Sequence, residues 1–368
     1  MDRAMVYFTD FRMKNGQNHE TKLRKLMKAA GMDQIDFAGK YVAIKIHFGE
    51  LGNLAFLRPN FAKYVADYVK ELGGKPFLTD CNTLYVGSRK NALDHLDTAN
   101  LNGFNPMSTG CQILIADGLK GTDEVEVPVN GGVLCKTAKI GRAVMDADIV
   151  ISLNHFKGHE ATGFGGALKN LGMGCGSRAG KMEMHASGKP YVEQDSCIGC
   201  KACAKICAHD GPQFDETGKA TIDHDKCVGC GRCIGVCPMD AVCPGADDTF
   251  DNLNRKIAEY AKAVVDGRPN FHINIVNNVS PNCDCHAEND AAIVPDVGMF
   301  ASFDPVALDV ACAAAVNQQP VNPMSILRER AGVPDRFCGT HPTTNWRVGP
   351  EHAEAIGIGT QEYELITL

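Results

Sequence analysis

The sequence lacks long apolar runs and any excess of basic residues. Its formal net charge is −7 and its pI is about 5.9, whereas a nucleic-acid-binding surface needs a basic patch. The first apolar stretch, Met5–Phe8, is too short for the core of a signal peptide, and no run approaches the length of a membrane span. We therefore expect a cytoplasmic protein that binds neither nucleic acid nor a membrane.

The sequence also has no Walker motif and no dinucleotide fingerprint. Glycines stand at 163 and 165, but Leu168 occupies the place of the third glycine. Gly174, Gly176 and Ala179 match a looser form, but no predicted strand precedes them.

Cysteine is abundant, with 17 in 368 residues. Eight of them form two runs in which three cysteines are spaced by two residues and a fourth follows after three more. The runs are Cys197, Cys200, Cys203 and Cys207, and then Cys227, Cys230, Cys233 and Cys237. This spacing is typical of thiolates that hold cubane iron–sulfur clusters, and a doubled run holds two of them.

The fourth cysteine of each run lies too far along the chain to join its own three and ligates the other cluster. We therefore predict two [4Fe–4S] clusters. One is held by Cys197, Cys200, Cys203 and Cys237, and the other by Cys227, Cys230, Cys233 and Cys207. Disulfides or zinc are the alternatives, but a zinc site uses four ligands in pairs, which a third cysteine in each run fits poorly.

This region resembles a bacterial two-cluster ferredoxin, although Ala208 replaces the usual proline after the first run. The resemblance implies electron transfer with a redox partner protein. The nine other cysteines are an odd number in a chain without a secretory signal. That number argues against a disulfide framework and fits a reducing cytoplasm. Exposed low-potential clusters are sensitive to oxygen, so the chemistry of the predicted clusters favours an anaerobic cytoplasm.

Outside the cysteine runs, predicted strands alternate with predicted helices. The strands are 4–9, 41–47, 76–79, 112–116, 124–129, 148–153, 271–276, 297–303 and 363–367; the helices are 19–31, 59–72, 88–102, 138–147, 250–265, 305–317 and 350–356. This order indicates an α/β fold with an open, mostly parallel sheet covered by helices on both faces. We predict a discontinuous α/β domain of residues 1–188 and 247–368. An α+β ferredoxin-like domain is inserted at 189–246, with a small hairpin at 214–222.

Polar residues follow the predicted parallel strands, and ligands bind at the carboxyl ends of such strands. His47, Glu50, Asp80 and Asp117 are therefore expected on one rim, although polar loops commonly begin at such positions. The segment 154–185 is richer in chemical groups. Histidine and lysine can bind or protonate a substrate, so the candidate catalytic residues are His155, Lys157, His159 and Lys169.

Two further motifs lie near this rim. Gly163, Gly165 and Gly166 lead into a predicted helix that Thr162 would cap, and a glycine-rich helix N-terminus can bind a small anionic substrate. The alternative is that these glycines only allow close packing beside the clusters.

The second motif is Cys283, Cys285 and His286. In an extended segment, residues 283 and 285 point to the same side. Two thiols and an imidazole predict an additional metal, with Cys81 or Cys175 as a further ligand, and buried free cysteines are the alternative.

The stretch Leu153–Asn170 looks like the core motif of domain-of-unknown-function family three-six-two, and Lys45–Glu50, Asp80–Arg89 and Asp296–Asp309 also match. Members with an inserted two-cluster ferredoxin are described as iron–sulfur centre proteins. The resemblance implies a Rossmann-like domain but no reaction. A more distant similarity to the nickel-pincer lactate racemase domain implies a site at His155, His159 and Lys169.

These patterns favour an electron-transfer iron–sulfur protein. The alternative is an oxidoreductase in which the clusters deliver electrons to a small anionic substrate, a metal or a second cofactor on the rim. The large α/β domain motivates this alternative, because a plain carrier does not need it. A redox sensor that uses cluster loss as its switch is a third hypothesis.

Overall fold

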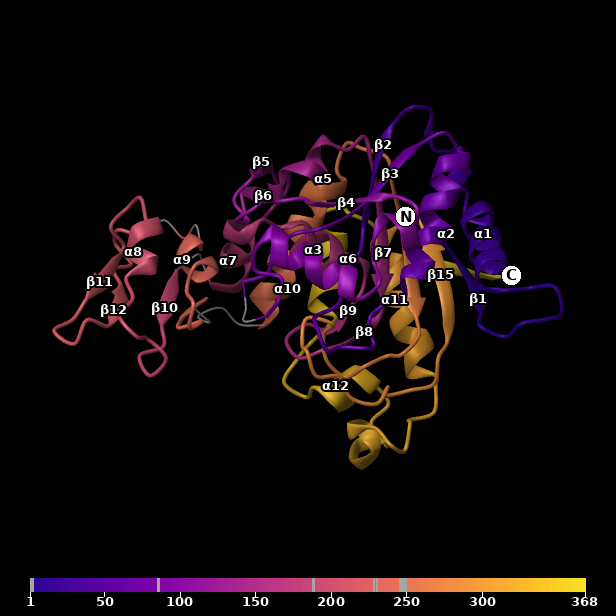
Figure 1. The fold of residues 1–368 in the computed structure, drawn as a ribbon. Coiled ribbons are helices and arrows are strands. Elements are labelled where there is room, and N and C mark those ends of the chain that lie inside the picture. The colour runs from indigo at the N-terminus through magenta and orange to yellow at the C-terminus, as the bar shows by residue number, and fades with distance from the viewer. Residues whose placement is uncertain (1–2, 85–86, 187–188, 228, 230, 245–249) are drawn as a thin grey trace.

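The computed structural model describes residues 3–84, 87–186, 189–227, 229, 231–244 and 250–368, and its centre is an eight-stranded sheet (Figure 1). The strand order is β16-β1-β15-β14-β7-β2-β3-β4. All neighbours pair in parallel except β15, which is antiparallel to both β14 and β1. The fold is therefore mixed α/β with a mostly parallel sheet. The strands are β1 (Ala4–Asp10), β2 (Tyr41–Lys45), β3 (Lys75–Asp80), β4 (Gln112–Ile115), β7 (Ile149–His155), β14 (Asn270–Val276), β15 (Gly298–Ser302) and β16 (Tyr363–Thr367).

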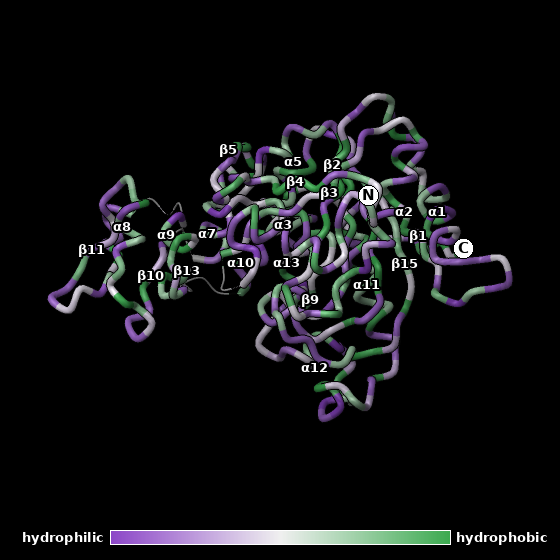
Figure 2. The backbone as a smooth tube through the Cα atoms, viewed as in Figure 1, coloured by the Kyte–Doolittle hydropathy of each residue, from purple (hydrophilic) through white to green (hydrophobic). Residues whose placement is uncertain are grey.

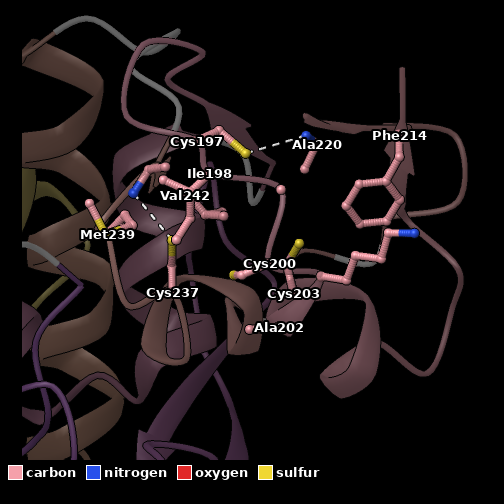
Figure 3. A pocket seen from close by; sticks show the side chains of 13 residues that line it. Cys197, Ile198, Cys200, Ala202, Cys203, Phe214, Ala220, Cys237, Met239 and Val242 are labelled. Carbon is pink, nitrogen blue, oxygen red and sulfur yellow. Dashed lines mark hydrogen bonds between the residues drawn. The ribbon is translucent and has the colours of Figure 1, made fainter. Parts of the chain in front are cut away.

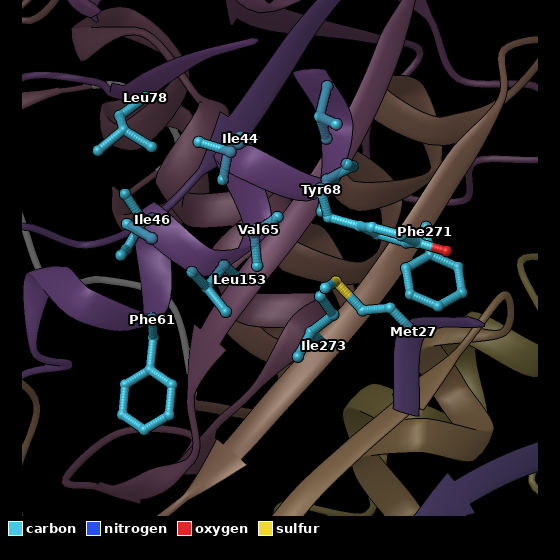
Figure 4. Close-up of a cluster of buried hydrophobic side chains, with 14 of the residues drawn as sticks. Met27, Ile44, Ile46, Phe61, Val65, Tyr68, Leu78, Leu153, Phe271 and Ile273 are labelled. Atoms are coloured by element: carbon cyan, nitrogen blue, oxygen red, sulfur yellow. The ribbon is translucent and has the colours of Figure 1, made fainter. Parts of the chain in front are cut away.

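Helices cover both faces of the sheet, as the alternation predicts. Ile151 and Leu153 of β7 pack into one buried cluster with residues of α1 and α2, such as Met27 and Val65 (Figure 4). Val150, which directly precedes Ile151, packs on the other side with residues of α6 and α10, because successive side chains of a strand point to opposite faces. The helices of this body are α1 (His19–Ala29), α2 (Pro59–Glu71), α3 (Ala92–Leu101), α4 (Pro106–Thr109), α5 (Arg142–Asp146), α6 (Ala167–Cys175), α7 (Arg178–Ala186), α10 (Phe250–Val265), α11 (Pro305–Asn317), α12 (Arg336–Thr340) and α13 (Val348–Ala355), with 3-10 turns at Met32–Gln34 and Ile326–Arg330.

The predicted helix at 138–147 is wrong. Residues Thr137–Gly141 form β6, which pairs antiparallel with β5 (Glu124–Pro128), and only the short α5 follows. Ala138 and Ile140 are buried while Thr137 and Lys139 are half-buried, and this alternation is the pattern of a strand. Helix α7 and the hairpin of β8 (Lys157–His159) and β9 (Gly163–Gly165) are further elements that the sequence did not predict.

The cysteine runs lie in a small lobe at one end of the molecule (Figure 1), and we call residues 190–244 the cysteine lobe. β10 (Pro190–Val192) pairs with β13 (Val242–Pro244) at the base of the lobe. β11 (Pro212–Phe214) and β12 (Ala220–Ile222) form the predicted hairpin, and the helices α8 (Ala202–Ile206) and α9 (Arg232–Gly235) are short. The tip of this hairpin, like the loop after β1, is mostly hydrophilic (Figure 2).

The cysteine lobe shares its small core with the body. Leu84 and Met182 of the body pack with Cys203, Ile234 and Val242 of the lobe, and Lys90 forms an ion pair with Asp240. Among the described residues, no helix is both long and apolar enough to cross a membrane.

Candidate functional site

One group of lobe cysteines surrounds a single cavity. Cys197, Cys200 and Cys203 of the first run and Cys237 of the second line this cavity (Figure 3). The other lining side chains are largely apolar and include Ile198, Phe214, Met239 and Val242. The structure therefore groups three thiols of one run with the last thiol of the other.

A second cavity repeats this arrangement with the roles of the runs exchanged. It is lined by Cys227 and Cys233 of the second run and by Cys207 of the first. Cys230, the remaining predicted ligand, lies outside the described residues. None of the cysteines that the structure describes forms a disulfide.

Backbone amides donate hydrogen bonds to four of these sulfurs. Ala220 N lies 3.4 Å from the Sγ of Cys197, and Ala241 N lies 3.2 Å from the Sγ of Cys237. Gly211 N and Gly229 N lie 3.4 Å from the sulfurs of Cys207 and Cys227, respectively. Thiolates are the ligands of iron–sulfur clusters, and hydrogen bonds to the sulfurs tune cluster potentials. The donor set and its surroundings fit a cluster in each cavity.

On the rim of the sheet, three of the four expected polar residues, His47, Glu50 and Asp80, meet around Arg89. Asp117 instead accepts from the side-chain amide of Asn82 at 2.8 Å. The Nε of Arg89 lies 3.0 Å from Glu50 Oε2, and one terminal nitrogen lies 3.1 Å from His47 Nε2. Asp80 accepts from Lys45 Nζ at 3.0 Å. Burial and the adjacent guanidinium lower the pKa of His47 to about 3. These charged groups largely pair with one another and stabilise the rim of the sheet.

His155 is held by both of its ring nitrogens. Nδ1 lies 2.9 Å from both carboxylate oxygens of Asp284, and Nε2 lies 2.8 Å from the carbonyl oxygen of Asn277. Lys157 Nζ is 3.5 Å from the same carboxylate. Since both ring nitrogens of His155 face oxygen acceptors, this residue orients Asp284 and its neighbours and has no nitrogen left for a substrate.

The glycine-rich helix N-terminus is filled from within the chain. The amides of Ala167 and Leu168, at the start of α6, donate to the carboxylate of Asp309 at 2.7 and 2.9 Å. A Cβ on Gly166 would lie 2.2 Å from that carboxylate. Asp309 therefore takes the place of the anionic substrate predicted for Gly163, Gly165 and Gly166. Thr162 does not cap α6, because its hydroxyl donates to the carbonyl of Phe164.

Two of the remaining candidates, Lys169 and His159, converge on the thiol of Cys283. Lys169 Nζ donates to Cys283 Sγ at 3.2 Å. His159 Nδ1 accepts from the amides of Ala161 and Thr162 at 3.1 and 3.2 Å, so the ring proton is assigned to Nε2. His159 also contacts Cys283, and its Nε2–H is the group that can donate to this sulfur.

The environment of Cys283 stabilises a thiolate. The hydrogen bond from Cys285 and the ammonium of Lys169, with help from Lys157 and His159, hold the pKa of Cys283 well below its ordinary value despite burial. The same contact and burial raise the pKa of Cys285. The Cys283 thiolate in turn raises the pKa of Lys169 against the effect of burial. We call Cys283, Cys285, Lys169 and His159 the thiol pair site.

A cluster of potential metal ligands lies beside this site. One ligand atom each of Glu160, Cys285 and His286 lies within 4.8 Å of the others. His286 Nε2 is 2.9 Å from Glu160 Oε1, and their side chains are 37% and 40% exposed. Cys285 and His286 were predicted metal ligands, whereas Glu160 was not.

The other predicted ligands do not complete this cluster, although Cys283 interacts with Cys285. Cys283 faces the ammonium of Lys169. Cys81 and Cys175 pack together in the core, where the Cys81 thiol donates to the carbonyl of Cys175 at 3.3 Å. Among the described residues the cluster therefore has three ligands and not the four of a structural zinc site.

The sheet order and the helices on both faces place the molecule among mixed α/β proteins, and the sequence comparison identifies its family. The family model described as "Domain of unknown function (DUF362)" matches residues 42–314. The match spans most of the chain, so the protein belongs to the DUF362 family, whose description assigns no activity. No curated protein matches the chain.

Two solved structures are similar at low identity. The lactate racemase apoprotein from Thermoanaerobacterium thermosaccharolyticum is 11% identical with a TM-score of 0.39, over 74% of this chain and 51% of that one. A protein from Thermotoga maritima, solved by the Northeast Structural Genomics Consortium, is 12% identical with a TM-score of 0.38, over 80% and 57%. This chain therefore spans about half the length of the racemase. Neither likeness carries an activity over to this chain.

Proposed function

We propose that this protein is an iron–sulfur electron-transfer protein with two [4Fe–4S] clusters in the cysteine lobe. The observation that carries this proposal is the grouping of thiols, because each cavity combines cysteines of one run with the fourth cysteine of the other. Such an exchange of the last ligand is the pattern of two-cluster ferredoxins. The amide donors beside the sulfurs support the same assignment.

Bound clusters would supply one-electron transfer, and the residues of the chain would hold and shield them. The apolar lining of the first cavity limits the access of water to its sulfurs. Ile198 and Met239, which are 63% and 47% exposed, lie at the outer edge of this cavity. A redox partner protein would deliver electrons at this exposed apolar edge, since apolar contacts of this kind favour protein docking.

The second candidate function is a reductase that uses the thiol pair site. The specific observation is that α7 connects the two sites. Met182 of α7 packs with Cys203 and Ile234 of the lobe. His185, one turn later, interacts with Lys169 and His159. A carrier alone does not need such a buried group of thiols, lysines and histidines.

Iron and acid-labile sulfide content tests the cluster assignment. Anaerobically purified protein should contain about eight irons and eight sulfides per chain. Cys203→Ser and Cys233→Ser should each lower both values by about half, whereas Cys338→Ser, outside the lobe, should change neither. Full content in the first two variants would refute the ligand assignment.

An additional metal at Glu160, Cys285 and His286 is the competing occupant of the rim. Such a metal would appear in purified protein beyond the lobe iron and would be lost in both Cys285→Ala and Glu160→Gln. Metal content that is unchanged by both substitutions would exclude this site and favour a thiol function. Cys283→Ala separates the two cases further, because its sulfur already faces an ammonium.

A further inference from the structure

We propose that Cys283 and Cys285 form a redox-active dithiol–disulfide pair that reduces a small organic disulfide with electrons from the cysteine lobe. This inference rests on the reductase function proposed above and specifies its substrate class. Both thiols are adjacent and interact directly. The segment is not extended as predicted but forms a tight turn, in which the amide of His286 donates to the carbonyl of Cys283 at 3.2 Å. Both cysteines belong to this one turn, so the two sulfurs can join without movement of a distant element.

Donors are arranged around the inner sulfur. Cys283 is 1% exposed, and its sulfur accepts from Lys169 Nζ at 3.2 Å. His159 also contacts this sulfur. Lys157 and Lys169 lie side by side along Gly165, where a Cβ would be 3.3 Å from atoms of both lysines. Two ammonium groups and an imidazole thus stabilise negative charge on Cys283, which neutral packing of a free cysteine does not require.

The outer sulfur is the one that a substrate can reach. Cys285 is half-buried, whereas Cys283 is buried. Cys285 also lies beside Glu160 and His286, whose side chains are more than a third exposed. A disulfide that enters past this ion pair would therefore meet Cys285 first, with Cys283 behind it as the proton acceptor.

The proposed exchange balances in atoms and charge. The Cys285 sulfur attacks one sulfur of the substrate while its proton passes to the Cys283 thiolate. The substrate S–S bond breaks, and the first product thiolate takes a proton from solvent. The Cys283 sulfur then attacks Cys285 Sγ in the mixed disulfide, and its proton leaves with the second product thiol.

The resulting Cys283–Cys285 disulfide must be reduced before the next cycle. Two electrons and one proton restore the Cys283 thiolate and the Cys285 thiol, so the net reaction is RSSR + 2 e⁻ + 2 H⁺ → 2 RSH. Two one-electron carriers in the lobe match this demand. The helix α7 supplies one connection through the chain, because Met182 packs in the lobe core and the charges of Lys169 and His159 act on His185.

The charges beside Cys283 favour a thiol pair over a cation. Lys157 and Lys169 lie beside Gly165, and Lys169 donates to Cys283, so a dication held by both thiols would face positive groups. Glu160 and His286 already satisfy each other at 2.9 Å. A metal ion at Cys285 would therefore not have the Cys283 thiolate as a ligand, because this thiolate is paired with the ammonium of Lys169. The metal would also have to break the ion pair between Glu160 and His286.

Differential alkylation and mass spectrometry test the pair itself. Anaerobic protein is treated with diamide, alkylated and digested with trypsin, with and without a later phosphine reduction. We expect Cys283 and Cys285 to form one disulfide, two hydrogens lighter, that the phosphine reverses. Cys312, which is 0% exposed, is the internal control and should stay a thiol.

Matched variants sharpen this test. Lys169→Met should slow disulfide formation by roughly tenfold, since loss of the ammonium raises the pKa of the thiol. Lys262→Met removes another buried lysine, paired with Asp266, and should have no effect. Thiols that stay reduced in wild type, or a metal that Cys285→Ala releases, would overturn the proposal.

Reduction through the lobe is tested separately. Reduced methyl viologen should convert the Cys283–Cys285 disulfide to thiols in the wild type and at least tenfold more slowly in Cys203→Ser. With bis(2-hydroxyethyl) disulfide as the probe, thiol release should require both cysteines and should be lost in Cys285→Ser.

The outcomes separate the two proposals. A low iron content would refute the clusters, whereas the phosphine-reversible disulfide would still report on the thiol pair. Equal reduction rates in wild type and Cys203→Ser would refute electron delivery from the lobe.

Discussion

The sulfurs of the cysteine lobe come from one short stretch of chain, whereas the groups around Cys283 come from three separate elements. In the lobe, Cys197, Cys200 and Cys203, each separated from the next by two intervening residues, line the same cavity. At the thiol pair site, His159 ends β8, Lys169 lies in α6, and Cys283 follows β14. The lobe is thus assembled by local spacing, and the thiol pair site is assembled by the sheet.

This difference also separates what stabilises the two regions. The buried core of the lobe is small and borrows Leu84 and Met182 from the body. The body has three extensive buried clusters along its sheet. Small units with so little apolar core usually need metals or disulfides to fold, and the described lobe cysteines form no disulfide. We therefore infer that the stability of the lobe depends on the proposed clusters, whereas the stability of the body depends on packing.

Removal of the proposed clusters should have the largest effect, and it should destabilise the lobe while the body stays stable. Anaerobic chelation and oxidation of the proposed clusters should increase proteolytic cleavage within residues 190–244 by more than about tenfold, or about 1.4 kcal/mol of local stability. Limited proteolysis with peptide mapping measures this change. Body peptides on β7 and α10 are the control and should keep their protection. A lobe that resists the protease equally without metal would contradict this prediction.

Loss of the internal anion should destabilise the body. Asp309 accepts from the amides of Ala167 and Leu168 and from Asn274 Nδ2 at 2.8 Å. Asp309→Ala leaves these buried donors without their acceptor and should lower the free energy of unfolding by about 4 kcal/mol. Urea unfolding followed on body peptides by hydrogen exchange measures this loss.

The control for that experiment is Asp36→Ala. Asp36 accepts from the amide of Ala38 in an exposed position, so its loss should change stability by no more than about 0.5 kcal/mol. Similar small losses for both variants would show that the Asp309 contacts contribute little.

The same carboxyl should make body stability depend on pH. Burial raises the pKa of Asp309 to about 6 from its ordinary 3.8. The folded state therefore binds the extra proton, so this contribution is fully present below about pH 4 and is lost as pH rises through 6. Its size is about 3 kcal/mol, since each pKa unit is worth about 1.4 kcal/mol.

Asp309→Asn cannot titrate and isolates this effect. The difference in unfolding free energy between wild type and variant should change between pH 4 and 7 by roughly that amount. A difference that is constant with pH would show that Asp309 titrates near its ordinary pKa.

Two neighbouring glycines provide the smallest and most selective test. Gly166→Ala would place a Cβ against Asp309 and should cost about 2 kcal/mol, because the carboxylate must move. Gly165→Ala would meet only the flexible ends of Lys157 and Lys169 and should cost less than about 1 kcal/mol. Thermal melts of the two variants, compared with wild type, measure the contrast, and equal losses would contradict it.

Much of the architecture follows from local patterns in the sequence. Apolar periodicity placed most strands and helices of the body, and the paired cysteine spacing placed the thiols that share each cavity. These features depend on residues close in the chain, where geometry leaves few choices. The wrong helix at 138–147 shows the limit, because its apolar residues suit either periodicity until β5 pairs with them.

The candidate rim was only partly predictable. Lys169 and Cys283 were singled out separately, but their contact spans α6 and the loop after β14 and depends on how the sheet brings them together. Nothing in the sequence indicated that Asp309 would accept from the amides at the start of α6, although it lies in the matching stretch Asp296–Asp309. Glu160 contacts His286 only because the folded chain brings these distant residues together. The sequence by itself determined most of the helices and strands of the body and the local thiol groups, but not β6, α7 or the β8–β9 hairpin. The tertiary structure alone decided which charges meet, because contacts between distant segments depend on the packing of the whole sheet.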